Sequence, residues 1–253
     1  MKQISIRSAL MRIMVVLFVA MVSVSASAQY YMNVVLRNGD TEMYPVDDID
    51  SMFISGKQPA HQYVDLGLSV KWASCNMGAS KPEEYGDYYS WAETWPKDEY
   101  SWFTYCHGNG DERNRKITKY NTNKLRGDVD NMTYLDLNDD AAFSKWGAPW
   151  HVPTVENIDE LRTKCKWTWT TLNGVNGYLV TSKVKGYTDR SIFLPAAGIM
   201  QNQMLLEEGY RGCYWANSLT NEPMNANMLM LEERRPYESA ATRSYGCCIR
   251  PVF

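Results

Sequence analysis

The chain has 253 residues, of which 45% are hydrophobic, 13% aromatic and 22% charged. This composition excludes an intrinsically disordered protein, a collagen-like repeat and a coiled coil. The formal net charge is −3; the first 28 residues hold three basic residues and no acidic one, so the remainder, with 23 basic and 29 acidic residues, has a net charge of −6. General nucleic-acid binding requires a basic face, so no nucleic-acid partner is expected.

The N-terminal 28 residues have the three-part layout of a secretory signal peptide. A basic stretch ends at Arg12, twelve nearly all apolar residues follow at 13–24, and Ala26-Ser27-Ala28 supplies the small residues that signal peptidase requires. Such an apolar helix spans about 18 Å, less than the roughly 30 Å hydrocarbon core of a bilayer. We therefore expect cleavage after Ala28, no membrane span in the mature chain, and a secreted or cell-surface protein. Retention in the periplasm is an open alternative.

All six cysteines lie in the part expected to be exported. An even number of cysteines in an oxidising compartment favours disulfides. No CxxC pair occurs, and the adjacent Cys247 and Cys248 would point to opposite faces of a strand, which disfavours a metal site. The sequence alone leaves the pairing of the cysteines open.

The segment 29–56 is predicted to be a short β-hairpin unit. Strand-forming residues at 31–36 are followed by an Asn38-Gly39 turn signal, a return strand at 42–46 and a further strand at 51–54. So short a unit buries little surface alone, so we expect it to pack on the next domain or on another chain. Residues 57–62 are predicted to be a linker.

Residues 63–253 are predicted to form one α+β domain with two short helices and small twisted antiparallel sheets. Asp139 and Asp140 cap a helix over 141–146 that Gly147 ends, and Thr154 caps a second helix that extends to Lys164. Strands are expected at 167–171, 178–183, 191–194, 212–216, 228–231 and 248–252. The stretch 100–132 has weak periodicity, which predicts a long loop that is functional or mobile.

The common catalytic and metal-binding motifs are absent from the sequence. None of the three histidines lies in an HExxH pattern or a spaced His/Cys cluster, and there is no GxSxG, phosphate loop or GxGxxG. We therefore expect a protein that is not an enzyme and that uses no metal or cofactor.

Two residue clusters allow a functional and a structural interpretation. The first is an acidic run formed by Asp128, Asp130, Asp136, Asn138, Asp139 and Asp140. It lacks the spacing of an EF-hand, so helix caps and a solvated loop are favoured over a calcium site. The second is an aromatic cluster formed by Tyr85, Tyr88, Tyr89, Trp91, Trp95, Tyr100 and Trp102. Such rings stack on sugars in some proteins, but burial in the core is the favoured interpretation.

A series of motifs after residue 61 resembles an exported domain of gut Bacteroidetes. The first reads YVDLGLSVKWA at 63–73. Further blocks in the same order occupy residues 76–79, 85–93, 139–142, 146–147, 150–154, 165–169, 173–178, 192–198, 214–215 and 249–252. With these blocks, which extend over nearly all of 61–253, the chain resembles the major paralogous domain family of Fibrobacter succinogenes.

The resemblance implies a C-type-lectin-like fold, related to formylglycine-generating enzymes and to the variable proteins of diversity-generating retroelements. Family members are mostly surface or secreted proteins without assigned chemistry. The chain departs from the family pattern at His151, Cys213, Cys247 and Cys248. Because three cysteines are additional to the family pattern, we expect one disulfide between Cys213 and either Cys247 or Cys248. A second disulfide is expected between Cys75 and Cys165.

In the variable relatives, diversified positions alternate with a fixed framework. The corresponding framework here is Trp215, Leu229, Leu231, Arg243, Gly246 and residues 250–252. Alternation over 228–231 would place the two Leu inward and the two Met outward. We therefore expect a ligand-binding surface that includes Asn217, Asn221, Asn227, Met230, Arg234, Arg235, Tyr237, Ser244 and Tyr245. An ordinary polar loop surface is the alternative.

Three functions remain from the sequence. The favoured one is an exported, non-catalytic module that recognises an extracellular protein or a glycan through the 210–245 surface. The second is a structural or adhesive subunit of a cell-surface assembly. The third, less favoured, is an oxidase of the formylglycine-generating type, which the adjacent Cys247 and Cys248 suggest.

Overall fold

The computed structural model describes residues 31–35, 41–46, 61–110 and 114–253. The signal peptide, the Asn38-Gly39 turn, the strand expected at 51–54 and most of the linker lie outside the described residues. The chain divides into two units after Ile54. In the first unit, β1 (Tyr31–Val35) pairs antiparallel with β2 (Thr41–Pro45).

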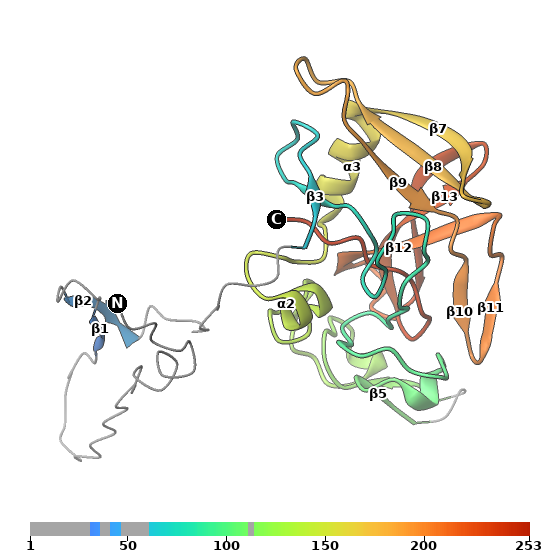
Figure 1. Cartoon of the computed structure of the whole chain (residues 1–253). Helices are drawn as coiled ribbons and strands as arrows, with labels where there is room; N and C mark the ends of the chain where they lie inside the picture. Colours follow the sequence, from blue (N-terminus) through green and yellow to red (C-terminus); the bar gives the residue numbers. More distant parts are fainter. Residues whose placement is uncertain (1–30, 36–40, 47–60, 111–113) are drawn as a thin grey trace, which may run out of the picture. The chain divides into compact units, whose positions relative to one another are not determined.

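The second unit is α+β, with two α-helices and several small antiparallel sheets among its described residues, as predicted (Figure 1). Helix α2 (Ala141–Trp146) begins after Asp140, whose carboxylate accepts a hydrogen bond from a first-turn N–H, and it ends at Gly147. Helix α3 (Val155–Lys164) begins after Thr154, which forms a capping box. Both predicted helices are therefore confirmed together with their N-terminal caps.

The first three-stranded sheet has the order β7-β8-β9. It comprises β7 (Cys165–Leu172), β8 (Val175–Ser182) and β9 (Ser191–Pro195), all antiparallel. The turn between β7 and β8 is Asn173-Gly174, and both residues have positive φ, 49° and 87°. This is the conformation that an Asn-Gly hairpin turn requires.

The second three-stranded sheet has the order β12-β13-β14. It comprises β12 (Arg211–Leu219), β13 (Asn225–Glu232) and β14 (Arg235–Thr242). The first two strands extend the predicted ones, whereas β14 was not predicted. The strand expected at 248–252 is present only as isolated bridges, such as that between Tyr214 and Cys248.

The remaining elements of the second unit are short. The two-residue and three-residue strands pair as β3 (Tyr63–Val64) with β4 (Trp72–Ala73), β5 (Gly108–Asn109) with β6 (Lys116–Ile117), and β10 (Ile199–Gln201) with β11 (Met204–Leu206). Two single turns of 3₁₀-helix are η2 (Trp102–Thr104) and η3 (Lys124–Arg126). The predicted 100–132 loop therefore contains β5, β6 and both 3₁₀ turns.

Strands β12 and β13 are buried on both faces over most of their length, whereas β14 has only half-buried and exposed residues. One face belongs to a hydrophobic cluster that we call the α3 core, which includes Ile158, Leu161, Tyr214, Leu229 and Leu231. The other face belongs to the α2 core, which includes Trp91, Ala141, Ala142, Cys213, Trp215 and Met228. The prediction that Met228 points to solvent is therefore wrong: its side chain is 3% exposed, because a second layer covers that face.

Candidate functional site

The sheet face that carries the α2 core opens to solvent at one end. Exposure rises along this face toward the β13–β14 turn. Antiparallel pairing sets Tyr237 beside the half-buried Met230. It also sets Arg211 and Arg235 on either side of Glu232. These five residues form what we call the open sheet face.

Hydrogen bonds hold three side chains of the open sheet face in a fixed array. The guanidinium of Arg211 donates to both carboxylate oxygens of Glu207, at 2.8 and 2.9 Å, and pairs through Nε with Glu232 at 2.8 Å. The Tyr237 hydroxyl donates to Glu232 at 2.9 Å. Glu207 raises the pKa of Arg211, and burial together with Glu232 raises the pKa of Tyr237. At neutral pH the array therefore presents a charged guanidinium and a protonated phenol.

Four of the nine expected binding residues belong to this end of the sheet. Met230, Arg235 and Tyr237 lie on the open sheet face, and the exposed Arg234 lies in its turn. Because a two-residue turn joins β13 to β14, these side chains come from adjacent positions of one hairpin.

The other five expected residues lie elsewhere, so the structure does not gather the nine into one surface. Asn217, Asn221 and Asn227 belong to the other end of the β12–β13 pair, where the Asn227 amide donates to the Ser218 hydroxyl at 3.0 Å and to a main-chain carbonyl. The amide oxygen of Asn217 is buried and lacks a hydrogen-bond partner among the described residues.

Ser244 and Tyr245 follow the end of β14. Ser244 is 1% exposed, so the expectation that its side chain faces a ligand is wrong. Its main-chain carbonyl accepts a hydrogen bond from the Ser90 hydroxyl. Tyr245 is half-buried and accepts a hydrogen bond from the Gln201 amide at 2.6 Å. These two residues secure the segment after β14 to its neighbours.

Two framework arginines are fully buried and bind main-chain carbonyls of distant segments. Arg243 donates to the Tyr105 hydroxyl at 2.6 Å and to carbonyls of Lys119, Tyr120 and Pro223. Arg250 donates to the Asn76 amide oxygen and to three carbonyls, and burial lowers its pKa. The family resemblance predicted both as framework positions, but nothing in the sequence predicted which segments they connect.

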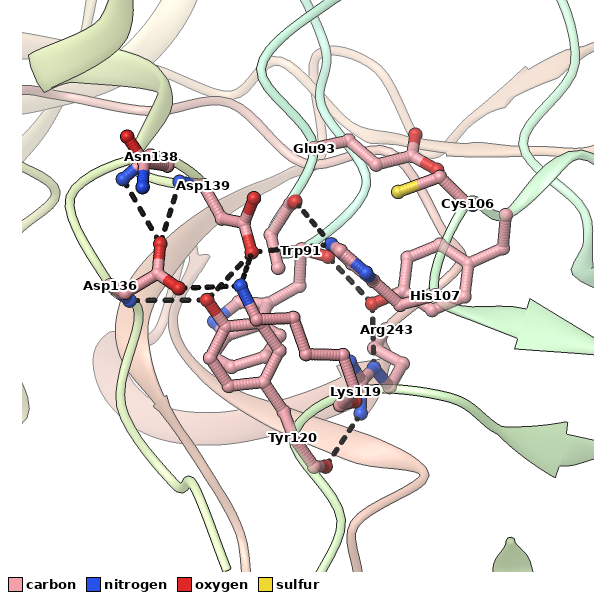
Figure 2. A network of polar contacts seen from close by, with 12 residues as sticks. Trp91, Glu93, Cys106, His107, Lys119, Tyr120, Asp136, Asn138, Asp139 and Arg243 are labelled. Atoms are coloured by element: carbon pink, nitrogen blue, oxygen red, sulfur yellow. Dashed lines mark hydrogen bonds and ion pairs between the residues drawn. The ribbon is translucent and has the colours of Figure 1, made fainter. Parts of the chain in front are cut away.

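A polar network extends from Arg243 into the acidic run (Figure 2). The Lys119 ammonium pairs with Asp136 at 2.5 Å and with Asp139 at 2.7 Å, while the Tyr120 hydroxyl donates to Asp139. Burial acts to lower the pKa of Lys119, but these two carboxylates outweigh it and raise that pKa. Asp140 caps α2 as predicted. Asp136, Asp139 and Asp140 therefore each bind a group of the fold itself, which supports the structural interpretation of the acidic run.

Cys106 and His107 lie beside this network (Figure 2). Cys106 is exposed as a residue, but the surroundings of its sulfur and the neighbouring Glu93 carboxylate raise its pKa, so the thiol stays protonated at neutral pH. Burial lowers the pKa of His107, whose Nε2 lies 2.9 Å from the carbonyl oxygen of Ala92 and 3.5 Å from Asp139. A protonated thiol beside an imidazole engaged with a main-chain carbonyl is not an activated nucleophile.

Most of the predicted aromatic cluster is buried. Tyr89, Trp91, Tyr100 and Trp102 are at most 3% exposed. Tyr85 and Tyr88 are half-buried and pack against the α3 core. Trp95 is 69% exposed, and the Lys145 ammonium lies 3.1 Å from its ring centroid. The favoured core interpretation therefore holds for the four buried rings and fails for Trp95.

All six cysteines are free thiols in the structure. Cys213 and Cys247 share the α2 core, and the parallel bridge between Tyr214 and Cys248 sets them side by side. Burial and the neighbouring Cys213 raise the pKa of Cys247. Cys248 belongs to the α3 core, as the opposite-face argument requires. Of the two candidate pairings of Cys213, the geometry favours the one with Cys247.

Comparison of the chain with protein-family models, curated proteins and solved structures finds no match. Within the described ranges, no helix has both the length and the apolar character to cross a bilayer.

Proposed function

We propose that this chain is an exported, non-catalytic binding module that recognises an extracellular protein or glycan through the open sheet face. The signal-like N-terminus supports export, and the motif resemblance supports a C-type-lectin-like fold for the second unit. The proposal rests most directly on the prearranged Arg211–Glu232–Tyr237 array.

Prearrangement matters because ordering a side chain on binding costs about 0.5–1.5 kcal/mol. In the open sheet face, Glu232 holds Arg211 and Tyr237 before any ligand arrives. Beside them, Arg235 is exposed and Met230 is half-buried. Tyrosine, arginine and methionine are enriched in recognition surfaces, because they combine apolar contact area with directed polar groups.

The test is capture of immobilised ligands by the labelled mature chain. Arrays of plant, mucin and bacterial cell-wall glycans, and of extracellular proteins, serve as probes. Tyr237→Ala should lower capture at least tenfold on each positive probe. Tyr134→Ala is the matched control, because Tyr134 is 58% exposed and precedes α2, outside the open sheet face. Equal capture by the two variants would overturn the placement of the site.

A structural or adhesive subunit is the second candidate, and one observation favours it. Strand β14 is the outer strand in the order β12-β13-β14, so one of its edges has no strand partner among the described residues. Such an edge is able to pair with a strand of another chain. Light scattering of the mature chain at increasing concentration tests this: growth of the scattering mass supports self-association, and a constant monomer mass contradicts it.

A further inference from the structure

A polar cleft lies at the end of the β13–β14 ladder opposite the open sheet face. Its volume is about 500 Å³, and its lining includes Arg115, Lys116, Arg126, Glu222, Asn225 and Thr242. The register places Asn225 opposite Thr242 at this end and Glu232 opposite Arg235 at the other. The cleft is therefore separate from the proposed recognition surface.

The lining of this cleft has a net positive charge, although the chain as a whole is acidic. It includes three cationic side chains and one carboxylate. Glu222 already pairs with Arg126, at 3.1 Å. Arg115 and Lys116 are left without an anionic partner among the described residues, and Lys116 donates only to the Leu125 carbonyl, at 3.3 Å.

Arg115 carries a hydrogen-bond donor that no described residue uses. Its Nε atom is buried and has no partner in the described part of the chain, and its guanidinium lies 5.8 Å from the Trp102 ring centroid. A buried donor without a partner is costly, and a guanidinium presents a planar fork that matches carboxylate, sulfate and phosphate groups. Because the half-buried Arg115 lines the cleft, an anionic ligand there would supply acceptors for its guanidinium.

We propose that the cleft binds a small ligand through one carboxylate, sulfate or phosphate group, which Arg115 and Lys116 hold. The cleft volume falls within the range of small-molecule sites. The side chains of Asn225 and Thr242 add neutral polar groups to the same lining. They are suited to hydroxyl groups on the rest of the ligand.

The test compares four probes that share one scaffold. Glucuronate, glucose 6-sulfate and glucose 6-phosphate each carry an anion, and glucose is the neutral control. Calorimetric titration into the mature chain should show binding of at least one anionic probe and none of glucose. The probe that binds identifies the anion. Because the contact is ionic, raising the salt concentration should weaken binding.

Arg115→Gln should weaken binding of that probe at least tenfold, and Lys116→Gln several-fold. Lys116 is exposed, so its substitution leaves folding intact and keeps the proposal testable if Arg115→Gln fails to fold. Arg190→Gln is the matched control, because Arg190 lies between β8 and β9 and does not line the cleft. Tyr237→Ala should leave anion binding unchanged, which separates this site from the proposed function. Equal binding of glucose, no binding of any probe, or full binding by both cleft variants would overturn the proposal.

Discussion

The hydroxyl of Tyr237 donates a 2.9 Å hydrogen bond to the carboxylate of Glu232, which also pairs with Arg211. Tyr237 lies on β14, Glu232 on β13 and Arg211 on β12, so one carboxylate links all three strands of the sheet. The contact sets the direction of the phenol ring on a surface that is otherwise open. We regard Glu232 as the residue that positions this surface for recognition.

Glu232→Ala should therefore lower ligand capture while leaving Arg211 and Tyr237 in the open sheet face. Freed side chains must be ordered on binding, which predicts a threefold to tenfold loss, on the order of 0.5–1.5 kcal/mol. The measurement is the array capture described above, with Glu233→Ala as the control, since Glu233 lies in the adjacent turn. Unchanged capture by Glu232→Ala would show that the array is not needed for recognition.

Arg243→Met should destabilise the fold strongly. The substitution removes a buried cation and leaves the carbonyls of Lys119, Tyr120 and Pro223 without this donor. A loss of about 3 kcal/mol or more in the free energy of unfolding is expected, measured by urea denaturation. Arg235→Met, at an exposed position, should change it by less than about 0.5 kcal/mol. Similar losses for the two variants would contradict the structural role of Arg243.

In an oxidising compartment, Cys213 and Cys247 should form a disulfide. Both belong to the α2 core and lie side by side next to the Tyr214–Cys248 bridge, whereas Cys248 belongs to the opposite core. Peptide mass mapping of the exported protein should find the Cys213–Cys247 link and should still find it in Cys248→Ala. Its formation should raise stability by about 2–4 kcal/mol. A link from Cys213 to Cys248, or six free thiols, would refute this pairing.

The second suggested pair, Cys75 and Cys165, stays a prediction. Cys75 lies next to Ser74, whose hydroxyl is 3.6 Å from its sulfur, and Cys165 begins β7. Burial raises the pKa of Cys165 to about 11, so this thiol is protonated at neutral pH. The same mass mapping tests the pair.

Acidification should destabilise the protein in part through His107. Burial lowers the pKa of His107 in the folded state below its usual value of 6.5. The unfolded chain therefore takes up the proton first as the pH falls. The stability is fully present above about pH 6.5 and is lost as the pH falls toward the folded pKa.

His107→Gln should flatten this pH dependence as the pH falls below about 6.5. It should not abolish it, because burial also lowers the pKa of His61. Urea unfolding at stepped pH values is the measurement. An unchanged slope in His107→Gln would show that this residue does not carry the linkage.

The sequence predicted the helices well because their ends depend on local chemistry. Asp140 and Gly147 bound α2, and Thr154 begins α3, through contacts within a single turn. Strand β14 was missed because Pro236, Glu238 and the two alanines near its end lack strand-forming character. It forms because it pairs with β13 along its whole length.

The binding surface was predicted only in part, because distant segments decide which side chains are exposed. Met228 alternates with leucines as a surface residue would, but Trp91 and α2 supply a second core on its face. Ser244 is likewise buried against Ser90. The polar cleft was not predicted, because its lining comes from four separate stretches between residues 114 and 242.

The most direct test of recognition by the open sheet face is amide hydrogen exchange of the mature chain, with and without the probe that it captures best. The account predicts new protection at residues 230–238, around the β13–β14 turn, with little change near Arg115 and Lys116 at the other end of the ladder. Protection confined to other segments, with 230–238 exchanging as in the free protein, would contradict it.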